Sequence, residues 1–110
     1  MRTPQAPQWE RTAVSWLLDL CPPEYRGYPV LGRYPLALAR LALLHTEAGV
    51  EAGRRALASA RADFADVLPA PALTEVIEVI EVEQARLIAA RRAVTLVGRA
   101  LRGERYVPRL

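Results

Sequence analysis

The sequence is poor in the residues that build catalytic and metal sites. Its 110 residues include one histidine, one cysteine, one methionine and no lysine, and aromatic residues make up only 6%. One histidine and one cysteine are too few for a zinc-type cluster within a chain, and a single cysteine excludes an internal disulfide. Neither Ser15 nor Ser59 has a histidine near it in the sequence, and no glycine-rich phosphate loop ends in lysine. We therefore predict no catalytic residue, no cofactor and no metal site, and expect that the protein is not an enzyme.

Long apolar runs are also missing. The most apolar stretch, 36–44, is interrupted by Arg40 and is far shorter than the ~20 residues that cross a bilayer. The first seven residues lack the apolar core of a signal peptide. The composition therefore favours a cytoplasmic protein that has no contact with the membrane.

What the chain does contain is an apolar residue at every seventh position in two long series. Such a repeat keeps one seam of a helix directed at a partner helix, as in a coiled coil. If the chain folds back at 68–71, the two series meet in a single register. The predicted pairs are Leu36–Leu101, Leu43–Val94, Val50–Leu87, Leu57–Ile80 and Phe64–Leu73. The pattern predicts an all-α fold in which a short N-terminal helix accompanies a long antiparallel two-helix hairpin.

We predict one helical domain, 1–110, because the chain is long enough for one core only. Its predicted segments are a flexible arm (1–7), a helix (8–20), a loop rich in Pro, Tyr and Arg (21–35), two long helices (36–68 and 72–102) and a tail (103–110). Pro69 and Pro71 bracket the hairpin turn, and Gly103 caps the last helix. Gly49 and Gly53 each cost roughly 1 kcal/mol in a helix interior. They leave open whether helix 36–68 is continuous or kinked.

Apolar residues off the seam indicate that the hairpin has a further partner. They are Leu38, Leu41 and Leu44 on the first long helix and Ile77, Val79, Val82 and Ile88 on the second. Burying them favours association, so we expect a homodimer with a core like a four-helix bundle. Glu83 interrupts the seam, and a partly buried carboxylate needs a partner. We predict a buried polar pair with Arg54, or with an arginine of another subunit.

All 15 basic residues are arginines, and many of them belong to one end of the predicted hairpin. The candidate interaction surface there consists of Tyr25, Arg26, Tyr28, Arg33, Tyr34, Arg99, Arg102, Arg105 and Tyr106. Arginine with tyrosine is typical of sites for phosphates or nucleic acid. The same arginines would also form ion pairs in an antiparallel dimer, whose basic ends lie beside acidic ones. The sequence leaves both interpretations open.

Three functions follow from these patterns. The first is a non-enzymatic, homo-oligomeric structural or protein-interaction module with an unknown protein partner. The alternative is a nucleic-acid-binding or phosphate-binding protein that uses the Arg-rich end of the hairpin. The third, an enzyme with a site around His45 and Glu83, is the weakest, because a lone histidine on an apolar helix is more often structural.

Three stretches also carry a resemblance. The segments 21–31, 33–41 and 105–110, with the sequences CPPEYRGYPVL, RYPLALARL and RYVPRL, resemble a family of small uncharacterised all-helical proteins from GC-rich bacteria. The resemblance implies a bacterial origin and a helical fold. It implies no activity, substrate or site residue.

Overall fold

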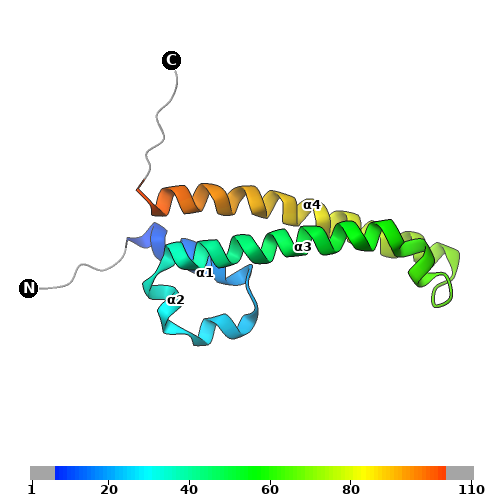
Figure 1. Ribbon diagram of the computed structural model, residues 1–110, viewed down its shortest axis with the longest axis horizontal. Helices are drawn as coiled ribbons and strands as arrows, with labels where there is room; N and C mark the ends of the chain where they lie inside the picture. The colour runs from blue at the N-terminus through cyan, green and yellow to red at the C-terminus, as the bar shows by residue number, and fades with distance from the viewer. Residues whose placement is uncertain (1–6, 104–110) are drawn as a thin grey trace, which may run out of the picture. The chain divides into compact units, whose positions relative to one another are not determined.

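The computed structural model describes residues 7–103, in which every regular element is a helix. The elements are α1 (Gln8–Asp19), the 3-10 helix η1 (Pro23–Gly27), α2 (Pro29–Arg33), α3 (Pro35–Phe64) and α4 (Ala70–Leu101). Helices α3 and α4 pack against each other as an antiparallel hairpin (Figure 1). The predicted all-α fold with a short N-terminal helix and a long hairpin is confirmed.

The chain divides into two compact units. Unit 1 consists of Met1–His45 and Arg92–Leu110, and unit 2 of Thr46–Arg91. Unit 1 holds α1, η1, α2, the first turns of α3 and the last turns of α4. Unit 2 holds the rest of the two long helices and the turn that joins them. The single domain that the sequence predicts is thus subdivided.

Three prolines at six-residue intervals each begin a helix. Pro23 is the first residue of η1, Pro29 of α2 and Pro35 of α3. Proline suits the first turn because its φ is already helical and the N–H that it lacks has no partner there. The prediction of a loop without regular structure over 21–35 is therefore wrong, since 5 residues in each of η1 and α2 are helical.

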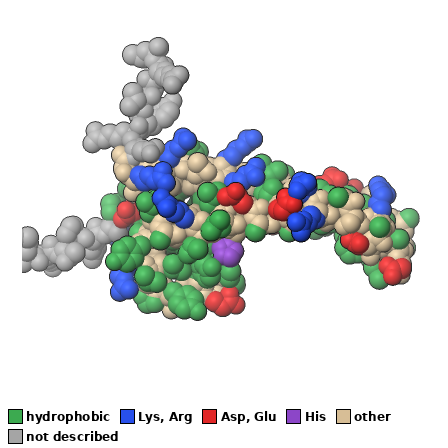
Figure 2. Space-filling model, in the orientation of Figure 1, with side chains coloured by type: hydrophobic (Ala, Val, Ile, Leu, Met, Phe, Trp, Pro, Cys, Tyr) green, Lys and Arg blue, Asp and Glu red, His purple; other side chains and the backbone are tan. Residues whose placement is uncertain are grey.

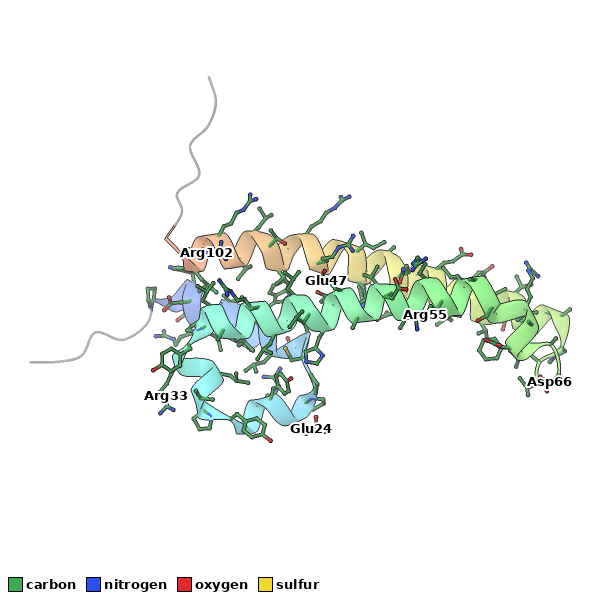
Figure 3. The ribbon with its side chains drawn as sticks, viewed as in Figure 1. Glu24, Arg33, Glu47, Arg55, Asp66 and Arg102 are labelled. Carbon is green, nitrogen blue, oxygen red and sulfur yellow. The ribbon has the colours of Figure 1, made fainter. Side chains whose placement is uncertain are left out.

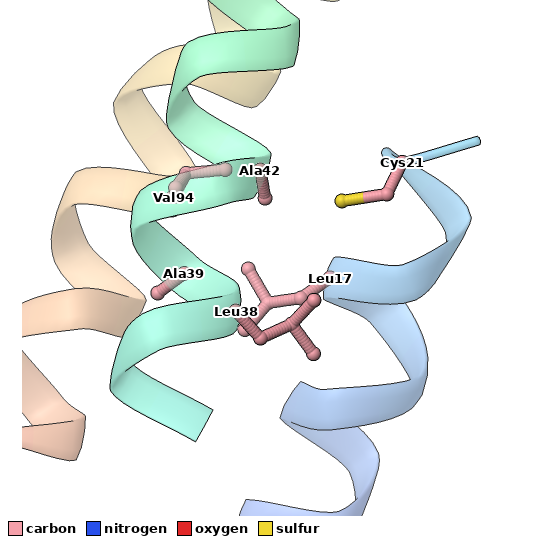
Figure 4. Close-up of a cluster of buried hydrophobic side chains, with 6 residues drawn as sticks. All are labelled: Leu17, Cys21, Leu38, Ala39, Ala42 and Val94. Atoms are coloured by element: carbon pink, nitrogen blue, oxygen red, sulfur yellow. The ribbon is translucent and has the colours of Figure 1, made fainter. Parts of the chain in front are cut away.

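The hydrophobic core of unit 1 lies where α1 meets the two long helices. Leu17 and Cys21 face Leu38 and Ala42 of α3, and Val94 of α4 completes the cluster (Figure 4). Leu17 and Leu38 are both 0% exposed. Burial also raises the pKa of the Cys21 thiol above its ordinary value, because the apolar surroundings disfavour the thiolate.

In unit 2, two glycines let side chains of α4 approach α3 closely. A Cβ atom at Gly49 would lie 3.0 Å from Cδ1 of Leu87, and one at Gly53 would lie 2.1 Å from Oε1 of Gln84. The Gln84 Nε2 group donates a hydrogen bond of 2.8 Å to the carbonyl oxygen of Val50. Helix α3 continues through both glycines, so the alternative of a break there is excluded. The approach of Leu87 to this turn agrees with the predicted register.

The helix ends differ from the prediction by a few residues around the hairpin turn. Helix α3 ends at Phe64 instead of residue 68, because Pro69 disfavours helical geometry in the residue before it. Helix α4 begins at Ala70, so Pro71 lies inside its first turn, where proline is tolerated. Gly103 has a φ of 81°, which confirms its predicted role as the C-terminal cap of α4. The predicted arm and tail lie almost wholly outside the described residues.

Candidate functional site

Three arginines line one groove in unit 1. The groove has a volume of about 230 Å³ and runs between the start of α3, which contributes Arg40, and the end of α4, which contributes Arg99. Arg102, the residue after the end of α4, also lines it. Its backbone N–H still donates to the Gly98 carbonyl in the helical pattern, so Arg99 and Arg102, three residues apart, share a face. The other lining residues are Leu36, Ala39, Leu43, Val94, Thr95 and Gly98. Figure 2 shows arginine side chains gathered over this part of α4.

The positive charge of this groove is not compensated within the described chain. No acidic residue among 7–103 lines the groove. Among residues 7–103, the guanidinium groups of Arg40, Arg99 and Arg102 have no carboxylate or hydrogen-bond partner. Guanidinium groups bind phosphate and carboxylate through parallel N–H bonds, so three of them around apolar side chains form a surface for an anion.

A second groove of about 420 Å³ adjoins the first and shares Leu36 and Arg40 with it. Arg33 and Tyr34 line this second groove, together with Glu10 of α1 and Leu101 of α4. Figure 3 shows Arg33 on α2 and Arg102 on the last turn of α4. Four predicted surface residues, Arg33, Tyr34, Arg99 and Arg102, are thus brought around Arg40. The predicted surface omitted Arg40, although its position between Leu36 and Leu43 places it beside the seam.

Other residues of the predicted surface have different roles. The Tyr25 hydroxyl shares a hydrogen bond of 2.9 Å with Nε2 of His45. The Arg26 guanidinium bonds to the Asp19 carboxylate on α1. Tyr28 is exposed but lines neither groove. Two further members, Arg105 and Tyr106, lie outside the described residues.

The predicted buried pair between Arg54 and Glu83 is wrong. Both side chains are exposed, and each bonds to a neighbour on its own helix. Arg54 donates from Nε and Nη2 to Glu51 at 3.0 and 2.6 Å, and Arg86 donates from Nε to Glu83 at 3.0 Å. These hydrogen bonds lower the pKa of both carboxyl groups, because they favour the charged form. An i,i+3 partner satisfies Glu83 in solvent, so it needs no buried one.

The polar side chain that α4 turns toward α3 is Gln84, one residue further along. Beside it, α3 and α4 form an apolar groove of about 340 Å³ in unit 2. On α3 the groove is lined by Gly49, Ala52, Gly53 and Ala56; on α4 it is lined by Val79, Ile80, Glu83, Gln84 and Leu87. Its walls are thus small residues on α3 and larger side chains on α4, two of them, Val79 and Ile80, β-branched.

His45 and Cys21 are of residue types that often catalyse reactions or bind metals, but here both pack against other side chains of the fold. His45 contacts the Tyr25 ring edge to face, with ring centroids 5.4 Å apart, and Cys21 is buried in the core. Among residues 7–103, no three His, Cys, Asp or Glu side chains form a group that could hold a metal ion. Within the same residues, no helix has the length and apolarity to span a membrane.

Comparisons with known proteins found no relative of this chain. No family model matches the chain, and neither a curated protein nor a solved structure matches it. The resemblance to small helical proteins of GC-rich bacteria therefore stays a prediction.

Proposed function

We propose that the protein is a non-enzymatic structural or protein-interaction module that works as a homodimer, in which the unit 2 hairpins of two copies form a four-helix core. The poor burial of unit 2 supports this proposal. Of residues 46–91, all of which the structure describes, only Thr46 and Ala60 are buried. Two helices of this length bury their apolar faces only when further helices pack on them.

The apolar groove of unit 2 provides the surface for that packing. Its α3 wall consists of Gly49, Ala52, Gly53 and Ala56, which leave room for side chains of another helix. On α4, Val79 lines the groove and is 67% exposed, and Val82, three residues further along, is 71% exposed. Small residues beside protruding side chains allow knobs-into-holes packing with another helix.

A second copy of the chain is the partner that this surface fits. A two-fold interface uses the same patch on both molecules, so the patch must contain both the knobs and the holes. Unit 2 carries both: the valines of one copy enter the small-residue wall of the other. Burying Val79, Ile80 and Val82 in each copy contributes about 1.5 kcal/mol or more per side chain, so the six side chains of a dimer contribute about 9 kcal/mol or more. This total is comparable with the roughly 4–15 kcal/mol that association costs.

Size-exclusion chromatography with light scattering tests the dimer directly. The wild-type chain is expected to elute at twice its mass of 12.2 kDa. Val79→Asp places a charge in the groove and is expected to shift the protein to the monomer, because a buried unpaired carboxylate is costly. Val67→Asp is the matched control, since Val67 is 65% exposed and does not line the groove. A monomeric wild type, or equal effects of the two substitutions, would contradict the proposal.

A further inference from the structure

Gly98 is a glycine that the packing of the chain does not explain. It lies inside α4, where glycine is less favourable than alanine. A Cβ atom at Gly49 or Gly53 would meet a side chain of α4, but one at Gly98 would meet nothing among residues 7–103 within 4 Å. Gly98 also lines the groove of Arg40, Arg99 and Arg102. A glycine in such a place lets a bound group approach the helix backbone closely.

The chemistry of the groove identifies the bound group as an anion with more than one charge. The side chains of Arg40, Arg99 and Arg102 line it, and among residues 7–103 none of the three has an acidic partner. A phosphate monoester carries a charge of about −1.5 to −2 at pH 7 and has three acceptor oxygens, which suits several guanidinium groups at once. Leu36, Leu43 and Val94 supply an apolar wall beside the charges. This wall favours a phosphate that is attached to a small apolar body.

The positions of the aromatic residues argue against a nucleic-acid strand as the ligand. Single-stranded nucleic acid needs a long basic groove with aromatic side chains on which successive bases stack. Among residues 7–103, no aromatic side chain lines this groove: Tyr34 lines only the adjoining groove, and Tyr25 is bonded to His45. The groove volume of about 230 Å³ corresponds to a single small group.

We infer that unit 1 binds the phosphate group of a small organic phosphate monoester between Arg40, Arg99 and Arg102, against the backbone at Gly98. This site lies outside the dimer surface of unit 2, so the inference goes beyond the proposed function and does not depend on it.

Calorimetric titration with inorganic phosphate and with phenyl phosphate tests the site, with sodium chloride at equal ionic strength as the reference. Both phosphates are expected to bind, and phenyl phosphate several-fold more tightly because its ring covers the apolar wall. Arg99→Gln is expected to weaken binding at least about tenfold, since it removes a charge-assisted contact. Arg61→Gln makes the same charge change in unit 2 at a residue that does not line the groove, and this variant is expected to bind like the wild type.

The Gly98→Ala variant distinguishes an effect on phosphate binding from an effect on folding stability. Without ligand, the variant is expected to unfold about 4 °C higher than the wild type, because alanine is the better helix former and its Cβ meets no neighbour. With phenyl phosphate, it is expected to bind about tenfold more weakly, because the added methyl group occupies the ligand position. A stabilised Gly98→Ala protein that binds as tightly as the wild type overturns the inference.

Further outcomes also decide against the site. Heat of binding no larger than that of chloride, or equal losses in Arg99→Gln and Arg61→Gln, would show that the arginines act only as general positive charge. Binding of an unphosphorylated single-stranded oligonucleotide without binding of phenyl phosphate would assign the groove to nucleic acid. A changed molecular mass of the Arg99→Gln variant in light scattering would assign it to a contact between copies.

Discussion

The Tyr25 hydroxyl lies 2.9 Å from Nε2 of His45, and this hydrogen bond joins η1 to α3 within unit 1. The two rings also meet edge to face, with an angle of 76° between their planes. Together the contacts hold the segment between α1 and α3 against the long helix. Both residues therefore have a structural role.

Tyr25→Phe removes this hydrogen bond and keeps the ring. The variant is expected to lose about 1 kcal/mol of the free energy of unfolding, because the His45 nitrogen is left without its partner. Urea denaturation followed by circular dichroism measures the change. Tyr28→Phe is the control, since Tyr28 is 57% exposed, and its effect is expected to stay below about 0.5 kcal/mol. Equal losses of unfolding free energy in the two variants would mean that the Tyr25 hydroxyl has no structural role.

Gly53 and Gln84 are expected to be coupled energetically. Gly53→Ala alone displaces Gln84, whose Oε1 lies 2.1 Å from the position of the new Cβ, so the hydrogen bond to Val50 is lost. This loss offsets the gain in helix propensity. In a Gln84→Ala background nothing is displaced, and Gly53→Ala is expected to stabilise by about 1 kcal/mol. A double-mutant cycle of unfolding free energies measures the coupling, expected near 1 kcal/mol. Additive effects would mean that the two residues do not meet.

Leu38→Ala is expected to be among the more damaging substitutions in unit 1. Leu38 is 0% exposed and packs with Leu17 between α1 and α3, so the substitution leaves a cavity. The expected loss is about 2–5 kcal/mol in the free energy of unfolding, measured by urea denaturation. Leu44→Ala deletes the same atoms from a residue of α3 that is 63% exposed, and its expected loss is below about 1 kcal/mol. Comparable losses would place Leu38 outside the core.

Glu83 is expected to titrate below the ordinary glutamate pKa of 4.5, because Arg86 bonds to its charged form. A carboxyl group with a lowered folded pKa stabilises the protein above its unfolded pKa. This contribution is lost as the pH falls from about 4.5 through the lowered folded value. Carboxyl-carbon NMR measures the titration directly. Arg86→Gln is expected to move the Glu83 pKa back toward 4.5, and an unchanged pKa would mean that the ion pair does not form in solution.

The prolines show that part of what the prediction missed was present in the sequence. Pro23, Pro29 and Pro35 stand at the first positions of three helices, which is the place that proline favours. The prediction did not apply this preference to Pro23 and Pro29, and so assigned a loop to 21–35. The exposed ion pair of Glu83 with Arg86 could also have been predicted from the sequence, since the two residues are three apart on one helix.

The two long helices and their pairing follow from the sequence alone. Its seven-residue apolar repeat requires a partner helix, and matching the two series sets the register that brings Leu87 to Gly49. The apolar repeat is a property of each helix taken alone, so it can be recognised in the sequence before the fold is known.

Which polar residues of the two helices meet depends in part on tertiary packing. Small rotations of α4 about its own axis determine whether Glu83 or Gln84 faces α3, and the structure selects Gln84. The meeting of Arg40 with Arg99 and Arg102, in contrast, follows from the antiparallel register that the sequence already sets. The contact of Gln84 with Val50 is not predictable in this way, because it depends on how residues that lie 34 positions apart in the chain pack together.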